Sequence, residues 1–236
     1  MPVSTKTSAS GTFSGDLIPP LENGDCLSRA EFERRYSAMP QLKKAELIEG
    51  VVYVPSPVRH RFHGQPHSYV TGWLVVYKAS TPGVQVSDNS TVRLDLDNES
   101  QPDALLLIDP ERGGQTFLSE DGYIEGPPEL VVEVASSSAS YDLHAKLQVY
   151  RRNGVREYIV WRVLDEEVDW FVLRESQYER LQPDADGRLR SDVFAGLWLD
   201  PAALVRNDLA TVLATLQQGL TSPEHTAFVT RLTSES

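Results

Sequence analysis

The chain has 236 residues, of which 34 are acidic and 22 are basic, so its formal net charge at pH 7 is −12. This charge excludes a basic coat that binds nucleic acid without specificity, but not a nucleic-acid enzyme whose metal ions screen a small acidic site. The length suits one domain with one continuous core, and 40% hydrophobic with 24% charged residues is typical of a globular protein.

Cysteine usage and the apolar runs indicate the compartment. The single cysteine, Cys26, has no partner for an internal disulfide, which favours a reducing cytoplasm. No apolar run approaches the ~20 residues of a membrane span. The first residues lack the charged and then apolar pattern of a signal peptide, so we expect a cytoplasmic protein without membrane contact.

The N-terminal part of the chain predicts an arm, a helix and a strand. Residues 1–24 are rich in Ser, Thr, Gly and Pro, which predicts a flexible arm. A Ser-x-x-Glu capping box at Ser28 predicts a short helix over 28–37. Apolar and polar residues then alternate over 44–54, which predicts one strand bent at Gly50.

The rest of the chain predicts a mixture of helices and strands. Apolar residues recur at helical spacing over 63–78, and the polar stretch 112–126 predicts an exposed loop with a small hairpin. We expect one domain over 25–218 and a flexible polar tail over 219–236. The remaining expected elements are strands at 84–86, 91–94, 104–108 and 130–134, a helix at 139–152, strands at 156–161, 168–173, 177–181 and 189–190, and one or two helices at 201–218.

Glu133 stands inside a β-branched run, 130–134, that otherwise predicts a buried strand. Burying even a neutral polar group without a partner costs ~2–7 kcal/mol, so this carboxylate needs a cation beside it, and a metal ion or a lysine would serve. On the helix expected next, Asp142, Lys146 and Tyr150 are spaced i, i+4, i+8 and share one face. That face can turn back over the C-terminal end of the strand.

Two further acids stand at or in extended runs: Asp103 after Pro102, and Glu46 in the strand at 44–54. Carboxylates on neighbouring strands suit a hard divalent cation, which polarises a phosphoryl oxygen and activates a bound water. A lysine beside them stabilises developing negative charge. Each residue also has an ordinary explanation: Asp103 as a strand start, Glu46 as surface alternation, Lys146 as a solvated helix residue. In combination they suit hydrolysis of a phosphodiester.

A histidine cluster is a weaker signal. His63 and His67 are spaced i, i+4 on the expected helix, with His60 just before them, and transition metals use this spacing. No third ligand stands at a diagnostic spacing, which favours solvent exposure or a substrate contact. The sequence contains no GxGxxG, GxxxxGK[ST], HExxH or GxSxG motif.

The joint order and spacing of these short motifs is similar to that of the Uma2 family. This bacterial family, formerly labelled DUF820, is grouped with the PD-(D/E)XK, or restriction-endonuclease-like, nucleases. The resemblance covers roughly residues 31–204. The matching stretches are Glu46-Leu47-Ile48-Glu49-Gly50, Pro102-Asp103, Pro128-Glu129-Leu130-Val131-Val132-Glu133-Val134 with Ser136, Asp142 with Lys146 and Tyr150, and Gly154-Val155-Arg156-Glu157-Tyr158.

The resemblance implies an α/β (α+β) fold: a restriction-endonuclease-like mixed β-sheet core flanked by helices, with an antiparallel β extension. It also implies that Asp103 and Glu133 hold Mg²⁺ or Mn²⁺, with the carbonyl of Val134 as a third ligand. The usual lysine of the superfamily stands two residues after the second acid, where this chain has Ala135. In Uma2-like sequences that lysine has moved to the following helix, where this chain has Lys146.

The function implied by the resemblance is metal-dependent endonuclease activity on nucleic acid, with DNA favoured as the substrate. Asp103, Glu133, Lys146 and Glu46 would form the catalytic set, Glu46 as an assisting acid or further ligand. Pairing is common in this superfamily, which suggests a homodimer. Two alternatives stay open: a nuclease-fold binding or interaction protein without catalysis, and a metal-dependent hydrolase of a smaller phosphate ester.

Overall fold

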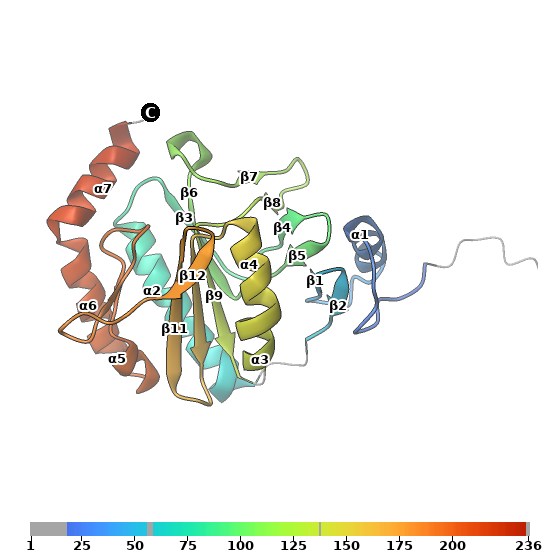
Figure 1. Cartoon of the computed structure of the whole chain (residues 1–236), viewed down its shortest axis with the longest axis horizontal. Helices are drawn as coiled ribbons and strands as arrows, with labels where there is room; N and C mark the ends of the chain where they lie inside the picture. Colours follow the sequence, from blue (N-terminus) through green and yellow to red (C-terminus); the bar gives the residue numbers. More distant parts are fainter. Residues whose placement is uncertain (1–17, 56–58, 137, 235–236) are drawn as a thin grey trace, which may run out of the picture.

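The computed structural model describes residues 18–55, 59–136 and 138–234. Two six-stranded sheets form its framework (Figure 1). The first sheet has the order β2-β1-β5-β4-β8-β7 and consists of short strands. These strands are β1 (Glu46–Ile48), β2 (Val51–Tyr53), β4 (Val92–Asp95), β5 (Asn98–Ser100), β7 (Phe117–Leu118) and β8 (Ile124–Glu125).

The second sheet has the order β12-β11-β10-β9-β6-β3 and forms the centre of the molecule. Its central pair, β9 and β10, is parallel, and the flanking pairs are antiparallel, as expected for a mixed core with an antiparallel extension. A separate two-stranded sheet joins β13 (Leu189–Arg190) and β14 (Trp198–Leu199). The strands of the second sheet are β3 (Val84–Ser87), β6 (Ala104–Ile108), β9 (Leu130–Ala135), β10 (Glu157–Arg162), β11 (Glu167–Arg174) and β12 (Gln177–Arg180).

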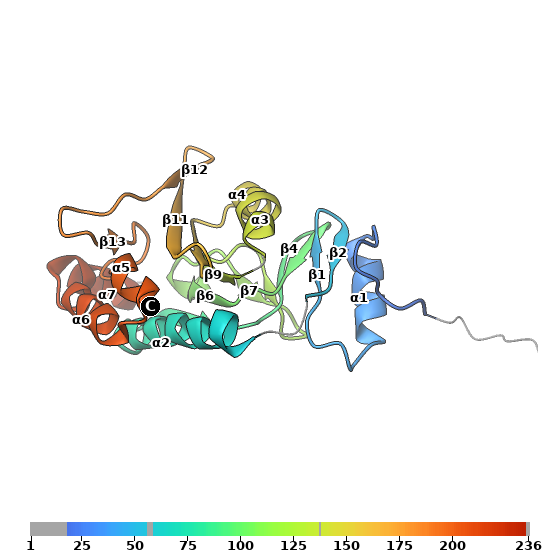
Figure 2. The same ribbon diagram turned by 90° about the horizontal axis from the view of Figure 1, so that it is seen from below.

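Helices cover both faces of the second sheet, which explains why its central strands read as continuous apolar runs (Figure 2). One face packs on α2 (Gln65–Ala79), α5 (Pro201–Val205), α6 (Leu209–Leu220) and α7 (Pro223–Ser234). The other packs on α3 (Ala139–Tyr141), the π-helical turn η3 (Asp142–Lys146) and α4 (Leu147–Asn153). Within the described residues, no helix combines the length and the apolar character that crossing a bilayer requires.

The first sheet begins as a hairpin, and the expected single bent strand over 44–54 is wrong. Glu49 and Gly50 have φ angles of 55° and 72° and separate β1 from β2. Positive φ at both central residues makes a two-residue hairpin turn, because its twist matches that of the flanking strands. The helix α1 (Arg29–Ser37) forms as expected beside this hairpin, although the Ser28 side chain makes no capping hydrogen bond.

The chain end is ordered as a helix, so the flexible tail expected over 219–236 is wrong for its described part. Phe228 and Leu232 of α7 are buried in the main core, and His225 lies 3.0 Å from the Thr81 hydroxyl. These apolar residues are separated by four positions and lie on one helix face. Of the arm predicted over 1–24, residues 1–17 lie outside the described residues.

Candidate active site

Asp103 immediately precedes β6, and Glu133 lies near the C-terminal end of the neighbouring strand β9. Ala104 pairs with Val132 in the antiparallel register, so the next position places Asp103 opposite Glu133 on the same face of the sheet. Both carboxylates are buried, each with 3% exposure. The backbone N–H of Val134 donates to Oδ2 of Asp103 at 2.8 Å, which fixes the carboxylate against β9.

The Lys146 ammonium joins the two sheets at this point. Its Nζ lies 2.8 Å from Oε1 of Glu133 in the second sheet and 2.9 Å from Oε2 of Glu46 in the first. A third carboxylate, Asp142, has its Oδ1 3.8 Å from the same nitrogen. The Tyr150 hydroxyl also donates to Oε1 of Glu133, at 3.1 Å. The helix face predicted from the sequence, with Asp142, Lys146 and Tyr150, is therefore the one that contacts Glu133. The buried cation that Glu133 needs is Lys146.

Two π-helical turns present the site residues. The expected regular helix over 139–152 is interrupted by η3, which widens the turn that carries Asp142 and Lys146. A second π-helical turn, η1 (His60–Gly64), precedes α2 and carries His63. Single π-helical turns inserted in α-helices are frequent at functional sites. Helical periodicity in the sequence does not reveal them, because the apolar spacing on either side remains that of an α-helix.

Lys44 and His63 also contact Asp103, and the sequence patterns predicted neither contact. Nζ of Lys44 lies 3.3 Å from Oδ1 of Asp103, and Nε2 of His63 lies 3.1 Å from Oδ2. Nε2 of His67 donates to the Asp103 carbonyl at 2.7 Å. Both rings are half-buried, so full solvent exposure, one of the two expectations for this pair, is wrong, while a substrate contact stays a prediction. One signal was available: Lys44 precedes Glu46 by two positions, so in an extended chain both point the same way.

Glu46 is a buried member of the site, with 5% exposure, and surface alternation does not explain it. Besides its contact with Lys146, its Oε1 accepts a hydrogen bond from the backbone N–H of Gln101 at 2.8 Å. Gln101 stands two residues before Asp103, so this hydrogen bond holds the chain segment that precedes Asp103 against β1. Glu46 of β1 therefore contacts both the segment that leads into β6 and the ammonium group of Lys146.

Burial and neighbouring charges shift the pKa values of Asp103 and Glu133 in opposite directions. Burial raises the pKa of Glu133, against the opposing effect of the Lys146 ammonium. Burial also acts to raise the pKa of Asp103, but the hydrogen bond from His63 and the charge of Lys44 outweigh it and hold that pKa well below its usual range. Asp103 is thus the firmly ionised acid of the pair.

The two lysines remain charged despite their burial. Burial acts to lower the pKa of Lys146, but the carboxylates of Glu133 and Glu46 raise it well above its ordinary value. The pKa of Lys44 is raised in the same way, against burial, chiefly by Asp103. The Asp142 carboxyl group also faces Lys146, with its Oδ1 3.8 Å from Nζ. Burial raises the pKa of Asp142, as it does that of Glu133.

The donor set decides which metal ion would fit. Among the described residues, no three His, Cys, Asp or Glu side chains are grouped so as to hold a metal ion. The carboxylates of Asp103 and Glu133 supply oxygen donors only, and from two side chains. Such a pair fits Mg²⁺, which binds through one or two carboxylates and keeps several waters, and not an ion enclosed by the protein alone.

The fold defines a protein of the nuclease-like α+β class. A crystal structure of "a putative nuclease belonging to DUF820" from Anabaena variabilis is similar to this chain, with a TM-score of 0.54 and 16% sequence identity. The similarity covers 73% of this chain and 97% of that one. No match was found among curated proteins. The family Uma2, described as "putative restriction endonuclease", matches residues 29–202, and the chain belongs to this family.

Proposed function

We propose that this protein is a metal-dependent endonuclease that hydrolyses phosphodiester bonds of DNA. The observation that carries the proposal is the convergence of three charged groups at the end of β9. Asp103 and Glu133 lie opposite each other on neighbouring strands, and the Lys146 ammonium lies 2.8 Å from Glu133. This set supplies oxygen donors for Mg²⁺ or Mn²⁺ and a cation for developing negative charge.

Each residue has a distinct role in this proposal. Asp103, kept ionised by Lys44 and His63, and Glu133 would hold the ion together with the Val134 carbonyl. When bound, the ion polarises a phosphoryl oxygen and lowers the pKa of a coordinated water. Lys146 supports the attacking water and fixes the orientation of the Glu133 carboxylate.

Glu46 assists from the first sheet in this proposal. It shares Lys146 with Glu133, and its other oxygen accepts from Gln101. The lysine is therefore held from both sheets, which fixes its amine before any substrate arrives. Such preorganisation is favourable for catalysis, because the groups that stabilise the transition state need no further ordering.

A catalytically silent member of the same fold is the second candidate, and two observations favour it. Ala135 occupies the position where the superfamily usually has its lysine. Lys146 is only 3% exposed and already contacts three carboxylates, so its charge is fully used within the protein. Such a protein would bind nucleic acid or another partner without cutting it.

Cleavage of supercoiled plasmid DNA in Mg²⁺ or Mn²⁺, with an EDTA control, separates these two candidates. The proposal predicts nicked and linear products with metal and none with EDTA. The matched variant is Glu133→Gln, which keeps the shape and the Tyr150 contact but removes the ionisable carboxyl group. It should lose cleavage, and calorimetric titration should show weaker Mn²⁺ binding. Intact plasmid in every metal would establish the silent candidate, and full activity of Glu133→Gln would exclude this site.

A further inference from the structure

A long stretch beside the site is free of acidic residues, although the chain as a whole is strongly acidic. No Asp or Glu occurs between Glu49 and Asp88, while the chain has 34 acidic residues in total. The stretch contains Arg59, Arg61 and Lys78 together with three histidines. Its local charge is therefore opposite to the net charge of −12. A local reversal of sign concentrates an anionic partner at one place on the surface.

Two histidines of this acid-free stretch contact the candidate active site. His63 of η1 contacts the Asp103 carboxylate at 3.1 Å, and His67 of α2 donates to the Asp103 carbonyl at 2.7 Å. Figure 1 shows the start of α2 and the start of α3 at the same end of the molecule. Arg59 and Arg61 are exposed and stand within four residues of His63. Both arginines therefore stand on the chain segment that leads into His63.

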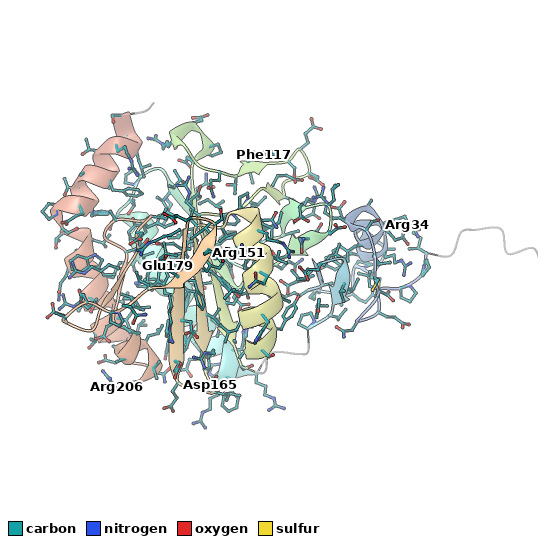
Figure 3. All side chains as sticks on the ribbon, in the orientation of Figure 1. Arg34, Phe117, Arg151, Asp165, Glu179 and Arg206 are labelled. Atoms are coloured by element: carbon teal, nitrogen blue, oxygen red, sulfur yellow. The ribbon has the colours of Figure 1, made fainter. Side chains whose placement is uncertain are left out.

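These two arginines differ from Arg162, the last residue of β10. Arg162 of β10 contacts Asp165 and Asp169, each at 2.7 Å, so its charge is neutralised within the protein. Asp165 lies at the same end of the molecule (Figure 3). Within residues 18–55, 59–136 and 138–234, neither Arg59 nor Arg61 forms an ion pair with an acidic residue. Their charge remains available to a ligand.

We propose that this surface binds the phosphate backbone of duplex DNA and directs a strand to the carboxylates. We call it the basic lip, formed by Lys44, Arg59, His60, Arg61 and His63. The proposal rests on the proposed function, because it assigns a binding surface to the substrate of that same site. Arginine suits the task because its planar fork matches the geometry of phosphate oxygens, and it stays charged at every physiological pH.

The residues of the basic lip form an inner group and an outer group. The inner residues, Lys44 and His63, contact Asp103 directly and are partly buried. The outer residues, Arg59 and Arg61, are exposed and precede His63 along the chain. Electrostatic repulsion by the acidic remainder of the surface disfavours other orientations of a polyanion. The basic lip would therefore supply most of the salt-dependent part of the affinity.

The experiment measures binding of a fluorescently labelled 20-base-pair DNA duplex by anisotropy, in EDTA so that no cleavage occurs. The full chain is compared with the double variant Arg59→Ala/Arg61→Ala and with Lys78→Ala. Lys78 is an exposed cation in the same acid-free stretch, about 20 Å further along α2 at 1.5 Å per residue. Each titration is repeated over a range of salt concentrations.

We expect the double variant to bind at least about ten-fold more weakly at low salt, while Lys78→Ala binds like the parent protein. The slope of log affinity against log salt should fall by about 0.9 for each phosphate group that the variant no longer neutralises. Equal affinity of parent and double variant, or an equal loss in Lys78→Ala, would overturn the basic lip but leave the nuclease proposal standing. No binding by the parent protein would overturn the basic lip, whereas metal-dependent cleavage in the plasmid assay tests the nuclease proposal separately.

Discussion

Lys146 is the residue of the candidate site that contacts three carboxyl groups at once. It is 3% exposed and contacts carboxylates from both sheets and from its own helical turn. Removing one partner of a buried ion pair is strongly destabilising, because it leaves an uncompensated buried charge. Without the lysine, Glu46 and Glu133 would face each other's charge and would have to take up protons.

Replacing Lys146 by methionine, which has a similar length and no charge, should therefore lower the free energy of unfolding by about 3–5 kcal/mol at pH 8. Urea denaturation measures the change. Lys78→Met is the matched control, because Lys78 is exposed at the far end of α2, and it should leave stability unchanged within about 0.5 kcal/mol. A loss below about 1 kcal/mol in Lys146→Met would contradict this interpretation of the site.

The sequence was sufficient to find part of this site and not the rest. Glu133 and Lys146 could be predicted because a charge inside an apolar run demands a partner, and the helical spacing indicated which face supplies it. The spacing of Lys44 from Glu46 indicated only that these two side chains point the same way. The contacts of Lys44 and His63 with Asp103 could not be predicted, because they depend on how separate elements fold back together. Such long-range contacts leave no periodic trace in a single sequence.

At the scale of elements, the contact between α6 and the segment before β14 depends on two glycines. A Cβ atom at Gly219 in α6 would lie 2.2 Å from the carbonyl oxygen of Gly196 and 2.8 Å from the Trp198 ring. Glycine weakens a helix interior relative to alanine by about 1 kcal/mol, so its presence here reflects the close approach of the backbones. The helix α6 forms although Gly219 lowers its intrinsic helix propensity.

Gly219→Ala should therefore destabilise the protein, by about 1–3 kcal/mol, although helix propensity alone predicts the opposite sign. The matched control is Gly72→Ala in α2, where a Cβ would meet nothing within 4 Å. That change should stabilise the protein by about 0.5–1 kcal/mol. Thermal unfolding of both variants distinguishes the cases. If both substitutions raise the melting temperature, the packing explanation for α6 is wrong.

Strands with an apolar pattern were predictable from the sequence, down to the two-residue strand β13, whereas a strand made of polar residues was not. The strands β6, β9, β10 and β11 lie where apolar runs predicted them. The three-residue strand β5 was missed, because its residues, Asn98 to Ser100, are polar and yet buried. Its burial comes from the neighbouring strands β1 and β4, so tertiary pairing overrode the local preference.

At the scale of the whole molecule, buried carboxyl groups make stability depend on pH. Glu157 at the start of β10 accepts hydrogen bonds from the Ser191 hydroxyl and from the backbone N–H groups of Asp192 and Val193. Burial outweighs these bonds and raises the pKa of Glu157 from 4.5 to about 7. The folded state therefore binds this proton more tightly than the unfolded state. Stability from this group is full below pH 4.5 and is lost as the pH rises through about 7.

Glu157→Gln removes that titration and should reduce the loss of stability on going from pH 4.5 to pH 8 by about 3 kcal/mol. Urea denaturation of both proteins at several pH values measures the difference. The other buried acids contribute equally to both curves, so the difference isolates Glu157. Parallel curves for the parent and the variant would show that this carboxyl group titrates normally in the folded protein.

The most direct measurement of the central claim is the rate of cleavage of linear duplex DNA in Mg²⁺ by Asp103→Asn and by Asp169→Asn. Asp169 is a buried acid in the same row of the second sheet, about 10 Å beyond Glu133 and paired with Arg162 and Arg180. Both substitutions remove one buried carboxylate from the same face of the sheet. We predict that Asp103→Asn abolishes cleavage while Asp169→Asn cuts at a rate close to that of the parent protein. Equal rates for Asp103→Asn and the parent would contradict the proposed site.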